Sequence, residues 1–358
     1  MKVVVIGAGY AGTLAANRLS KKIKPAEVTI VNQRPEFVER VRLHQLVAGT
    51  GTVAAPLTSM LQDGITSRVA TVNKIGDGTI ALDDGNRIDF DYAFLAVGSI
   101  ATPLPGTVPI VTWEGATQAR NAFTSLPTGS TVTVVGGGPT GIETAAEVAE
   151  VRPDLRVRLV GSSVADCFSH GAKRRVLSSL EQMKVDVIED VVSEVEASDG
   201  QFDGMVHLQS GTSFSSDLTV WAIVSGIPQL AAQSGLEVDV EGKAIVDEYL
   251  RSVSDPRVFV VGDCAAVPGA RKACQSALPQ ATHAANNLAS LLKGRELKPF
   301  ENHFRGLSIS LGRKDAVSQF ARPDDTMRRA YLSGRSATVV KELGSRGAKV
   351  GTRAGFGG

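Results

Sequence analysis

The 358-residue sequence contains only three cysteines, few aromatic residues and no excess of either charge. Cys167, Cys264 and Cys274 form no C-x-x-C pair, so we expect neither a disulfide framework nor a dithiol motif. With 38 basic and 37 acidic residues, the chain has no electrostatic footprint for nucleic acid. No apolar run approaches the roughly 18 residues that a membrane-spanning helix requires. These absences predict a cytoplasmic globular protein with reduced thiols.

The first thirty residues have the organisation of a βαβ unit. Met1-Lys2 leads directly into Val3–Ile6, an apolar run typical of a strand buried in a parallel sheet and unlike a signal peptide. Gly7 begins a turn, residues 10–22 are predicted to be helical, and Val28–Val31 is the next strand. The N-terminus therefore predicts an α/β fold.

The same organisation recurs 129 residues later (136 minus 7). Thr131–Val135 leads into a glycine turn, residues 140–151 are predicted to be helical, and Val157–Val160 is the return strand. The shift superimposes the three glycines of each turn: Gly7 on Gly136, Gly9 on Gly138 and Gly12 on Gly141. This internal repeat is the strongest organisational signal in the chain.

Each glycine turn has the spacing G-x-G-x-x-G, which suits a dinucleotide. The first glycine permits the turn, the second admits a pyrophosphate, and the third lets helix and strand pack closely. The pyrophosphate then binds the free N–H groups at the helix N-terminus. An isolated match can be merely structural, but here both copies follow a buried strand and open a helix. We predict two dinucleotide sites.

The ends of the two return strands leave the choice of nucleotide open. An acidic residue that bonds the ribose is expected there, but the two positions hold Asn32 and Gly161. The Asn32 amide can still bond a ribose hydroxyl. Three basic residues of the next predicted helix could bind a 2′-phosphate or form a solvated face: Lys173, Arg174 and Arg175.

Later in the chain, strands end in glycine at Ala96-Val97-Gly98 and at Val261-Gly262-Asp263, and a helix is predicted over residues 276–293. Residues 307–311 and 316–320 are predicted strands of a further small sheet. The tail from Arg322 onward is basic and glycine-rich, which predicts a poor helix. Solvated disorder and weak attachment to anionic lipid are its two interpretations.

Two dinucleotide units with these strand ends resemble the two-dinucleotide-binding-domain flavoproteins, which have the pyridine nucleotide-disulfide oxidoreductase fold. The resemblance covers about residues 1–320, and the departure is Val97 where the family has threonine. It implies an FAD domain, a second Rossmann-like domain for NADH or NADPH inserted into it, and a small C-terminal α+β region. The domain limits we expect are 1–112 and 241–300 for FAD, 113–240 for NAD(P)H, and 301–358 for the C-terminal region.

Within that family, residues 37–45 and 277–285 are similar to segments of type II NADH:quinone dehydrogenases and apoptosis-inducing-factor-like oxidoreductases. Disulfide reductases of the family need a cysteine just after the first unit, and residues 32–55 contain none. Thiol chemistry is therefore not expected.

The resemblance assigns cofactor binding to residues of the turns, strand ends and adjoining loops, and it assigns no metal ligand. These residues are Gly7, Gly9, Tyr10, Ala11, Gly12, Asn32, Gln33, Arg40, Val69, Ala96, Val97, Gly98, Gly136, Gly138, Pro139, Thr140, Gly141, Gly226, Gly262, Asp263 and Pro279.

Five further residues are candidates for catalysis and acceptor binding. Glu143 resembles the glutamate that these enzymes place near the nicotinamide, although an acid in the first helical turn also suits the helix dipole. Gln275 and Gln280 are the predicted acceptor residues, Gln280 also being counted as catalytic. His44 and His283 are predicted proton donors, or else make structural hydrogen bonds.

The resemblance implies that a hydride passes from NAD(P)H to FAD and that electrons then pass to an acceptor. Three functions stay open: a reductase of a quinone-like acceptor, a biosynthetic flavoenzyme acting on a specific small molecule, and a flavin-bearing redox sensor with little turnover. Contact with the inner face of a membrane through the basic tail, and a homodimer, are also left open.

Overall fold

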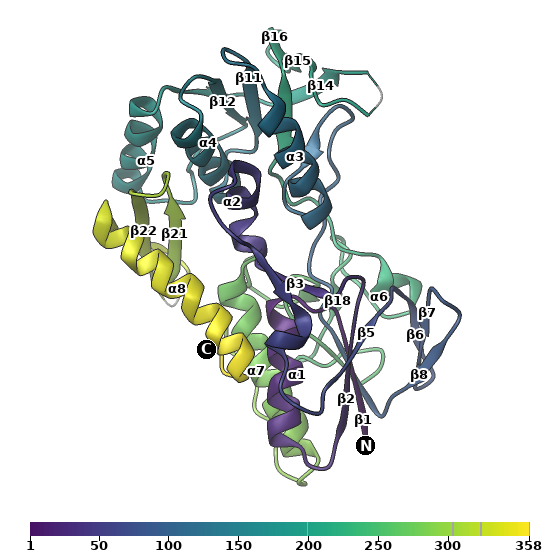
Figure 1. Ribbon diagram of the computed structural model, residues 1–358. Coiled ribbons are helices and arrows are strands. Elements are labelled where there is room, and N and C mark those ends of the chain that lie inside the picture. Colours follow the sequence, from purple (N-terminus) through teal and green to yellow (C-terminus); the bar gives the residue numbers. More distant parts are fainter. Residues whose placement is uncertain (199, 303, 323, 358) are drawn as a thin grey trace.

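The computed structural model describes residues 1–198, 200–302, 304–322 and 324–357. It contains two α/β units, each built on a five-stranded parallel sheet (Figure 1). The first α/β unit contains both the beginning of the chain and residues near 260, whereas the second α/β unit is formed by residues between them. The predicted α/β fold with two Rossmann-like units is thus confirmed.

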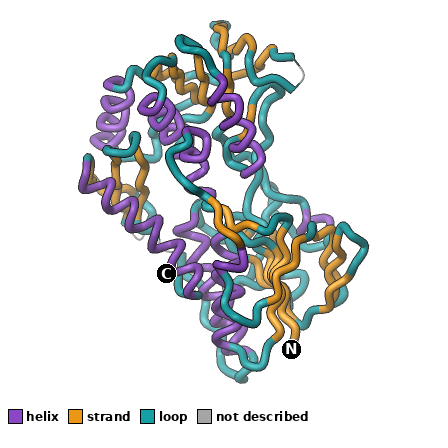
Figure 2. The backbone as a smooth tube through the Cα atoms, viewed as in Figure 1, coloured by secondary structure: helices purple, strands orange, loops and turns teal. Residues whose placement is uncertain are grey.

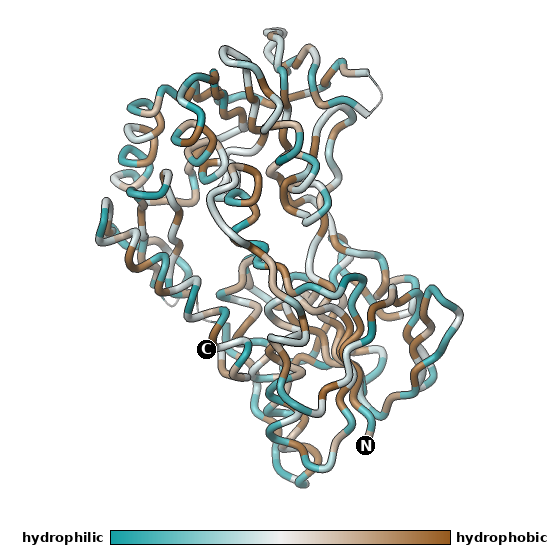
Figure 3. Tube along the Cα trace, viewed as in Figure 1, coloured by the Kyte–Doolittle hydropathy of each residue, from teal (hydrophilic) through white to brown (hydrophobic). Residues whose placement is uncertain are grey.

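The sheet of the first α/β unit has the strand order β19-β9-β1-β2-β5, with every pair parallel. The strands are β1 (Lys2–Ile6), β2 (Glu27–Asn32), β5 (Thr66–Val69), β9 (Tyr92–Leu95) and β19 (Val258–Val260). Because β9 and β19 pair directly, the second α/β unit is inserted between two adjacent strands of the first. Figure 3 shows hydrophobic residues concentrated along this sheet.

The sheet of the second α/β unit has the order β10-β17-β11-β12-β13 and is also parallel. The strands are β10 (Val108–Pro109), β11 (Thr131–Val135), β12 (Arg156–Gly161), β13 (Val185–Glu189) and β17 (Leu218–Trp221). All five residues of β11, three valines and two threonines, are buried, as expected for a β-branched strand in the middle of a parallel sheet.

The helices that follow the two glycine turns are α1 (Tyr10–Lys22) and α4 (Pro139–Val151), within one residue of their predicted starts. The other helices of the two units are α2 (Leu43–Ala48), α3 (Trp113–Ser125), α5 (His170–Gln182), α6 (Leu230–Gln233) and α7 (Cys274–Leu291). The predicted helix over 276–293 is therefore confirmed, displaced by two residues. α7 packs along α1 in the first unit.

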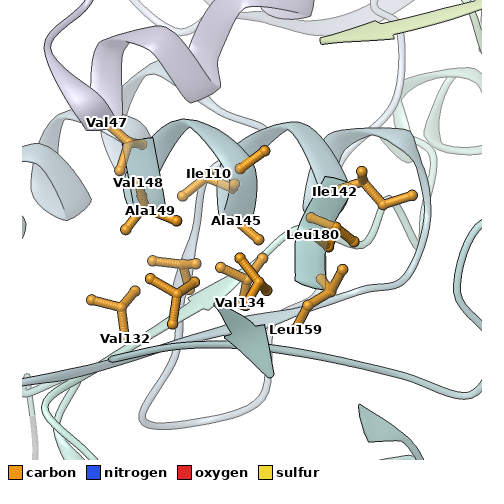
Figure 4. Packing of buried hydrophobic residues seen from close by; sticks show 14 of the residues in the cluster. Val47, Ile110, Val132, Val134, Ile142, Ala145, Val148, Ala149, Leu159 and Leu180 are labelled. Atoms are coloured by element: carbon orange, nitrogen blue, oxygen red, sulfur yellow. The ribbon is translucent and has the colours of Figure 1, made fainter. Parts of the chain in front are cut away.

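Helix α2 belongs to the first unit by sequence but packs against α3 and α4 of the second. Figure 4 shows the apolar contact: Val47 of α2 lies over Val148 and Ala149 of α4, whose inner face covers Val132 and Val134 of β11. The hydrophobic core of the second unit thus extends to α2, which fixes His44 on the same helix against α4.

The shorter elements are arranged around the two sheets (Figure 2). They are β3 (Glu36–Val38) with β4 (Ala54–Pro56), β6 (Val72–Gly76) with β7 (Thr79–Leu82) and β8 (Arg87–Asp89), β14 (Val192–Glu196) with β15 (Gly204–Leu208) and β16 (Ser213–Ser216), β18 (Ala244–Ile245) with β20 (Ala265–Ala266), and the single-turn helices at Arg40–Arg42 and Leu57–Met60.

The C-terminal region forms an antiparallel sheet of β21 (Gly306–Ser310), β22 (Ala316–Ala321) and β23 (Met327–Ser333), followed by the long helix α8 (Arg335–Ala354). The first two strands were predicted. The prediction of a poorly helical or disordered tail is wrong: α8 packs against β22 and then runs to α1 (Figure 1). Packing and ion pairs stabilise a helix that its glycine content alone would disfavour.

Candidate functional site

The two glycine turns have the same geometry in both α/β units. Gly7 and Gly136, the first glycine of each, have φ values of +97° and +128°, which favour glycine. A Cβ atom on Gly12 would lie 1.8 Å from the Gly7 carbonyl oxygen, and one on Gly141 would lie 1.7 Å from that of Gly136. The third glycine of each turn is therefore required by the close approach of helix and strand.

The second glycine of each turn, Gly9 or Gly138, faces open space, since a Cβ there would meet no heavy atom within 4 Å. Helices α1 and α4 begin at these glycines without a side-chain cap and without an acidic residue in the first turn. Their first N–H groups thus remain available to an anion. Both turns fit a dinucleotide pyrophosphate by shape and by donor chemistry.

Around the first turn, Tyr10 and Ala11 are buried at the start of α1. Asn32 lies at the end of β2, and its side-chain amide forms two hydrogen bonds with the backbone: Oδ1 accepts from Ala8 N at 3.1 Å, and Nδ2 donates to the Arg34 carbonyl at 2.8 Å. Asn32 therefore holds the strand end against the turn. Its register partner Val69 is half exposed, and Gln33 is exposed beside them.

At the ends of β9 and β19, three polar side chains form a hydrogen-bonded group. Arg40 Nη1 donates to Ser99 Oγ at 2.9 Å, and Ser99 Oγ donates to Asp263 Oδ2 at 2.6 Å. Arg40 Nη2 is buried with no partner among the described residues, and burial lowers the Arg40 pKa against the pull of Asp263. An unsatisfied guanidinium N–H beside the first turn suits a polar or anionic cofactor atom.

The sequence predicted Arg40, Gly98 and Asp263 but missed Ser99, which directly follows the predicted Ala96-Val97-Gly98. Ala96 lies against Gly7, because a Cβ atom on Gly7 would be 2.5 Å from the Ala96 carbonyl oxygen. In the second unit, Pro139 and Thr140 begin α4. Gly226 N donates to the Ile100 carbonyl at 3.1 Å, and this bond links the two segments in which the chain passes between the units.

Glu143 on α4 is buried and is contacted by groups from three other segments. Ser310 N of β21 donates to its Oε1 at 3.0 Å, Lys341 Nζ of α8 donates to the same oxygen, and His44 Nδ1 of α2 lies 3.8 Å from Oε2. We call Glu143, His44, Lys341 and Ser310 the Glu143 cluster. The structure brings the predicted Glu143 and His44 together, while Lys341 and Ser310 were not predicted.

The charges of the Glu143 cluster follow from burial and neighbours. Burial lowers the pKa of His44 to about 4, and Lys341 acts in the same direction, so His44 is neutral at neutral pH. Burial alone would raise the pKa of Glu143, but the Lys341 ammonium and the Ser310 N–H outweigh it and lower that pKa overall. The cluster therefore holds a carboxylate, an ammonium and a neutral imidazole. His44 Nε2 is buried and has no partner among the described residues.

One turn further along α4, Glu147 is fully buried. Its Oε1 accepts from Thr50 Oγ1 and lies 3.8 Å from Arg313 Nε. Burial raises the pKa of Glu147 in spite of these two partners. Helix α4 thus carries two buried carboxyl groups with pKa shifts of opposite sign, lowered for Glu143 and raised for Glu147.

The structure places the predicted acceptor residues in structural contacts. Gln280 Oε1 accepts from Gly262 N at 2.7 Å, and Gln275 Oε1 accepts from Arg305 N at 2.8 Å. His283 Nε2 lies 2.7 Å from the Lys298 carbonyl oxygen, and with Pro279 and Phe300 it lines a surface cavity of about 310 Å³. The described contacts of His283 do not connect it to the Glu143 cluster.

All three cysteines are free. Burial raises the pKa of Cys167 and of Cys264 to about 11, and it also raises that of Cys274. The thiols are therefore protonated at neutral pH, which is unfavourable for thiolate chemistry.

Comparison with known proteins agrees with this geometry. The family model described as pyridine nucleotide-disulphide oxidoreductase matches residues 1–287. Ferroptosis suppressor protein 1 of Taeniopygia guttata is 27% identical over 335 residues, covering 89% of this chain and 88% of the relative. The alternative NAD(P)H-ubiquinone oxidoreductase C1 of Arabidopsis thaliana is 26% identical, covering 88% of this chain and 72% of the relative. The solved structure of the sulfide:quinone oxidoreductase of Aquifex aeolicus superimposes with a TM-score of 0.83 at 19% identity, covering 99% of this chain and 92% of that one.

Proposed function

The chain belongs to the pyridine nucleotide-disulphide oxidoreductase family, and on that premise we propose that it oxidises NAD(P)H through a bound FAD and reduces a quinone-like acceptor. The observation that carries the proposal is the pair of open glycine turns together with the buried Glu143 cluster. Two turns accommodate two dinucleotides, and the cluster supplies acid–base groups where protein-bound protons are needed.

By chain order, the first turn holds FAD and the second holds NAD(P)H. When bound, FAD supplies the chemistry of accepting a hydride and releasing electrons to a second substrate. Arg40, Ser99 and Asp263 offer it a guanidinium N–H, a hydroxyl and a carboxylate within one hydrogen-bonded group. Gln280 is a positioning residue, because its hydrogen bond fixes Gly262 next to Asp263.

A quinone-like acceptor is supported by the names of similar proteins and by the charge of the site. The Arabidopsis relative is named for ubiquinone and the Aquifex structure for a quinone. Reducing a quinone with two electrons consumes two protons, of which the hydride donor supplies only one. Neutral His44, whose Nε2 has no partner among the described residues, and Glu143 beside it can relay the second proton, while the Lys341 ammonium stabilises developing negative charge.

Anaerobic mixing of the holoprotein with NADH or NADPH, followed by menadione, tests this function. We expect the visible flavin absorbance to disappear with a nicotinamide nucleotide and to return with the quinone. Absorbance that neither nucleotide removes would contradict reductase activity and favour the redox-sensing protein. Rapid bleaching that ferricyanide reverses and quinones do not would favour the biosynthetic flavoenzyme.

We also propose that the outward face of α8 contacts an anionic membrane surface. Val339, Leu343 and Val350 lie along that face and are 57%, 66% and 66% exposed. Arg346 and Arg353 are exposed beside them. Apolar side chains flanked by cations are typical of interfacial helices. Among the helices that the structure describes, none is both long and apolar enough to cross a bilayer.

Sedimentation with phosphatidylglycerol vesicles tests the membrane contact. We expect binding at low ionic strength that decreases with salt, because each basic residue near the surface contributes about 1 kcal/mol. Leu343→Ser should weaken this binding several-fold, whereas Val240→Ser, a change at a fully exposed valine outside α8, should not. Equal binding of both variants, or no binding by the wild type, would contradict the proposal. The mass of the unbound protein in solution tests the homodimer.

A further inference from the structure

The end of β12, where a ribose-binding acid is expected, cannot carry a side chain. A Cβ atom on Gly161 would lie 2.5 Å from Gly137 N and 3.1 Å from the Ser163 carbonyl oxygen. Strand β12 is thus pressed directly onto the second glycine turn. The missing carboxylate is a steric consequence of that approach, so an acid for the ribose must come from another position.

Strand β13 provides such an acid. Glu189 is its last residue and is the register partner of Gly161. Glu189 Oε1 accepts from Val164 N at 3.3 Å, and the next residue, Ala165, donates its N–H to the Gly137 carbonyl at 3.0 Å. Two hydrogen bonds therefore connect the Glu189 carboxylate to the glycine turn. The side chain is 53% exposed, so a ligand can reach it.

We propose that Glu189 takes the place of the missing strand-end acid, accepting hydrogen bonds from the adenosine ribose and making the second site select NADH over NADPH. This inference rests on the proposed binding of NAD(P)H at Gly136–Gly141. A carboxylate in that position bonds the ribose hydroxyls and repels a 2′-phosphate. The described hydrogen bonds of Glu189 use only Oε1, which leaves Oε2 as an acceptor.

The charges around Glu189 support the same selection. Lys173, a candidate phosphate ligand, donates to both Asp166 and Glu189, so one ammonium is shared by two carboxylates. Arg175, another candidate, is bound to Asp315 at 2.7 Å and to Ser179. The third candidate, Arg174, is exposed on α5.

The local balance is therefore negative. Asp166, Glu189 and Lys173 together carry one net negative charge, and Asp190 adds another beside them, its N–H bonding the Gly161 carbonyl at 3.0 Å. A 2′-phosphate carries up to two further negative charges into this surrounding. The ribose of NADH carries none there, so the electrostatic penalty applies to NADPH alone.

Calorimetric titration of the oxidised holoprotein with ADP-ribose and with 2′-phospho-ADP-ribose tests the inference without turnover. We expect ADP-ribose to bind at least about tenfold more tightly to the wild type. Glu189→Gln should reduce that ratio and Glu189→Arg should reverse it. Glu181→Gln, the same chemical change at an exposed position near the C-terminal end of the adjacent helix α5, is the matched control and should leave the ratio unchanged.

Steady-state rates with NADH and NADPH, with ferricyanide as acceptor, give the second readout, because this assay does not depend on quinone. Changes are expected in KM more than in kcat. A wild type that prefers the 2′-phosphorylated ligand would overturn the inference, as would Glu189→Gln and Asp166→Asn variants with the wild-type ratio. If Glu189→Arg does not fold, Glu189→Gln and Asp166→Asn still test whether these carboxylates set the ratio of the two affinities. Binding of neither ligand would instead contradict the nucleotide site itself.

Discussion

The Gly138→Ala variant is expected to stay folded and yellow while losing its reduction by NAD(P)H. The added methyl group meets no protein atom within 4 Å, so the fold and its melting temperature should not change. It does enter the space that the pyrophosphate needs at the start of α4. A displacement of about 1 Å can reduce a rate by roughly 100-fold, and we expect at least that loss in the anaerobic bleaching rate.

Gly9→Ala is the matched variant in the first turn. It also meets no protein atom, and it should yield a folded protein that has lost FAD and its colour. Gly141→Ala serves as a different control, because its Cβ would lie 1.7 Å from the Gly136 carbonyl oxygen and must distort the turn itself. Loss of FAD from Gly138→Ala, or wild-type bleaching by that variant, would show that the two nucleotides are wrongly assigned.

These turns could be predicted from sequence because all their determinants are local. Strand, glycines and helix follow one another within about twenty residues, so spacing alone fixes the geometry. The starts of α1 and α4 accordingly lie within one residue of the prediction. The 129-residue repeat confirmed that neither match was accidental. The proposed replacement of the acid missing at Gly161 by Glu189 depends on a pairing between strands that no linear spacing reveals.

The Glu143 cluster and α8 could not be predicted because their partners are distant in sequence. Lys341 lies 198 residues from Glu143, and Lys349 donates at 2.7 Å to Glu39, 310 residues away. Glycines in the tail gave a correct estimate of low helix propensity, but tertiary contacts outweighed it. The sequence predicted Gln280 as an acceptor residue, and only the structure showed that its side-chain amide oxygen accepts a hydrogen bond from Gly262 N.

Replacing Lys341 with alanine is expected to produce the largest loss of stability. The Lys341 and Glu143 side chains are only 16% and 9% exposed, and removing the cation leaves a buried carboxylate without its main partner. Breaking a buried pair costs about 3 kcal/mol or more. The double variant Glu143→Gln/Lys341→Met removes both charges at similar volume, so it should be less destabilised than Lys341→Ala alone. Thermal unfolding of the wild type, Glu143→Gln, Lys341→Met and the double variant measures the coupling.

The pH dependence of this loss has a definite sign and a matched control. The folded-state pKa of Glu143 is lowered, so the pair stabilises the protein above the unfolded-state pKa of about 4.3, and that stability is lost as the pH falls through the folded-state value. The penalty of Lys341→Ala should therefore shrink on acidification. Arg346→Ala removes an exposed pair with Glu342 on the same helix and should cost less than about 1 kcal/mol at any pH. If Lys341→Ala costs no more than Arg346→Ala, helix α8 does not hold Glu143 in its charged form, and the acid–base role proposed for the Glu143 cluster loses its electrostatic basis.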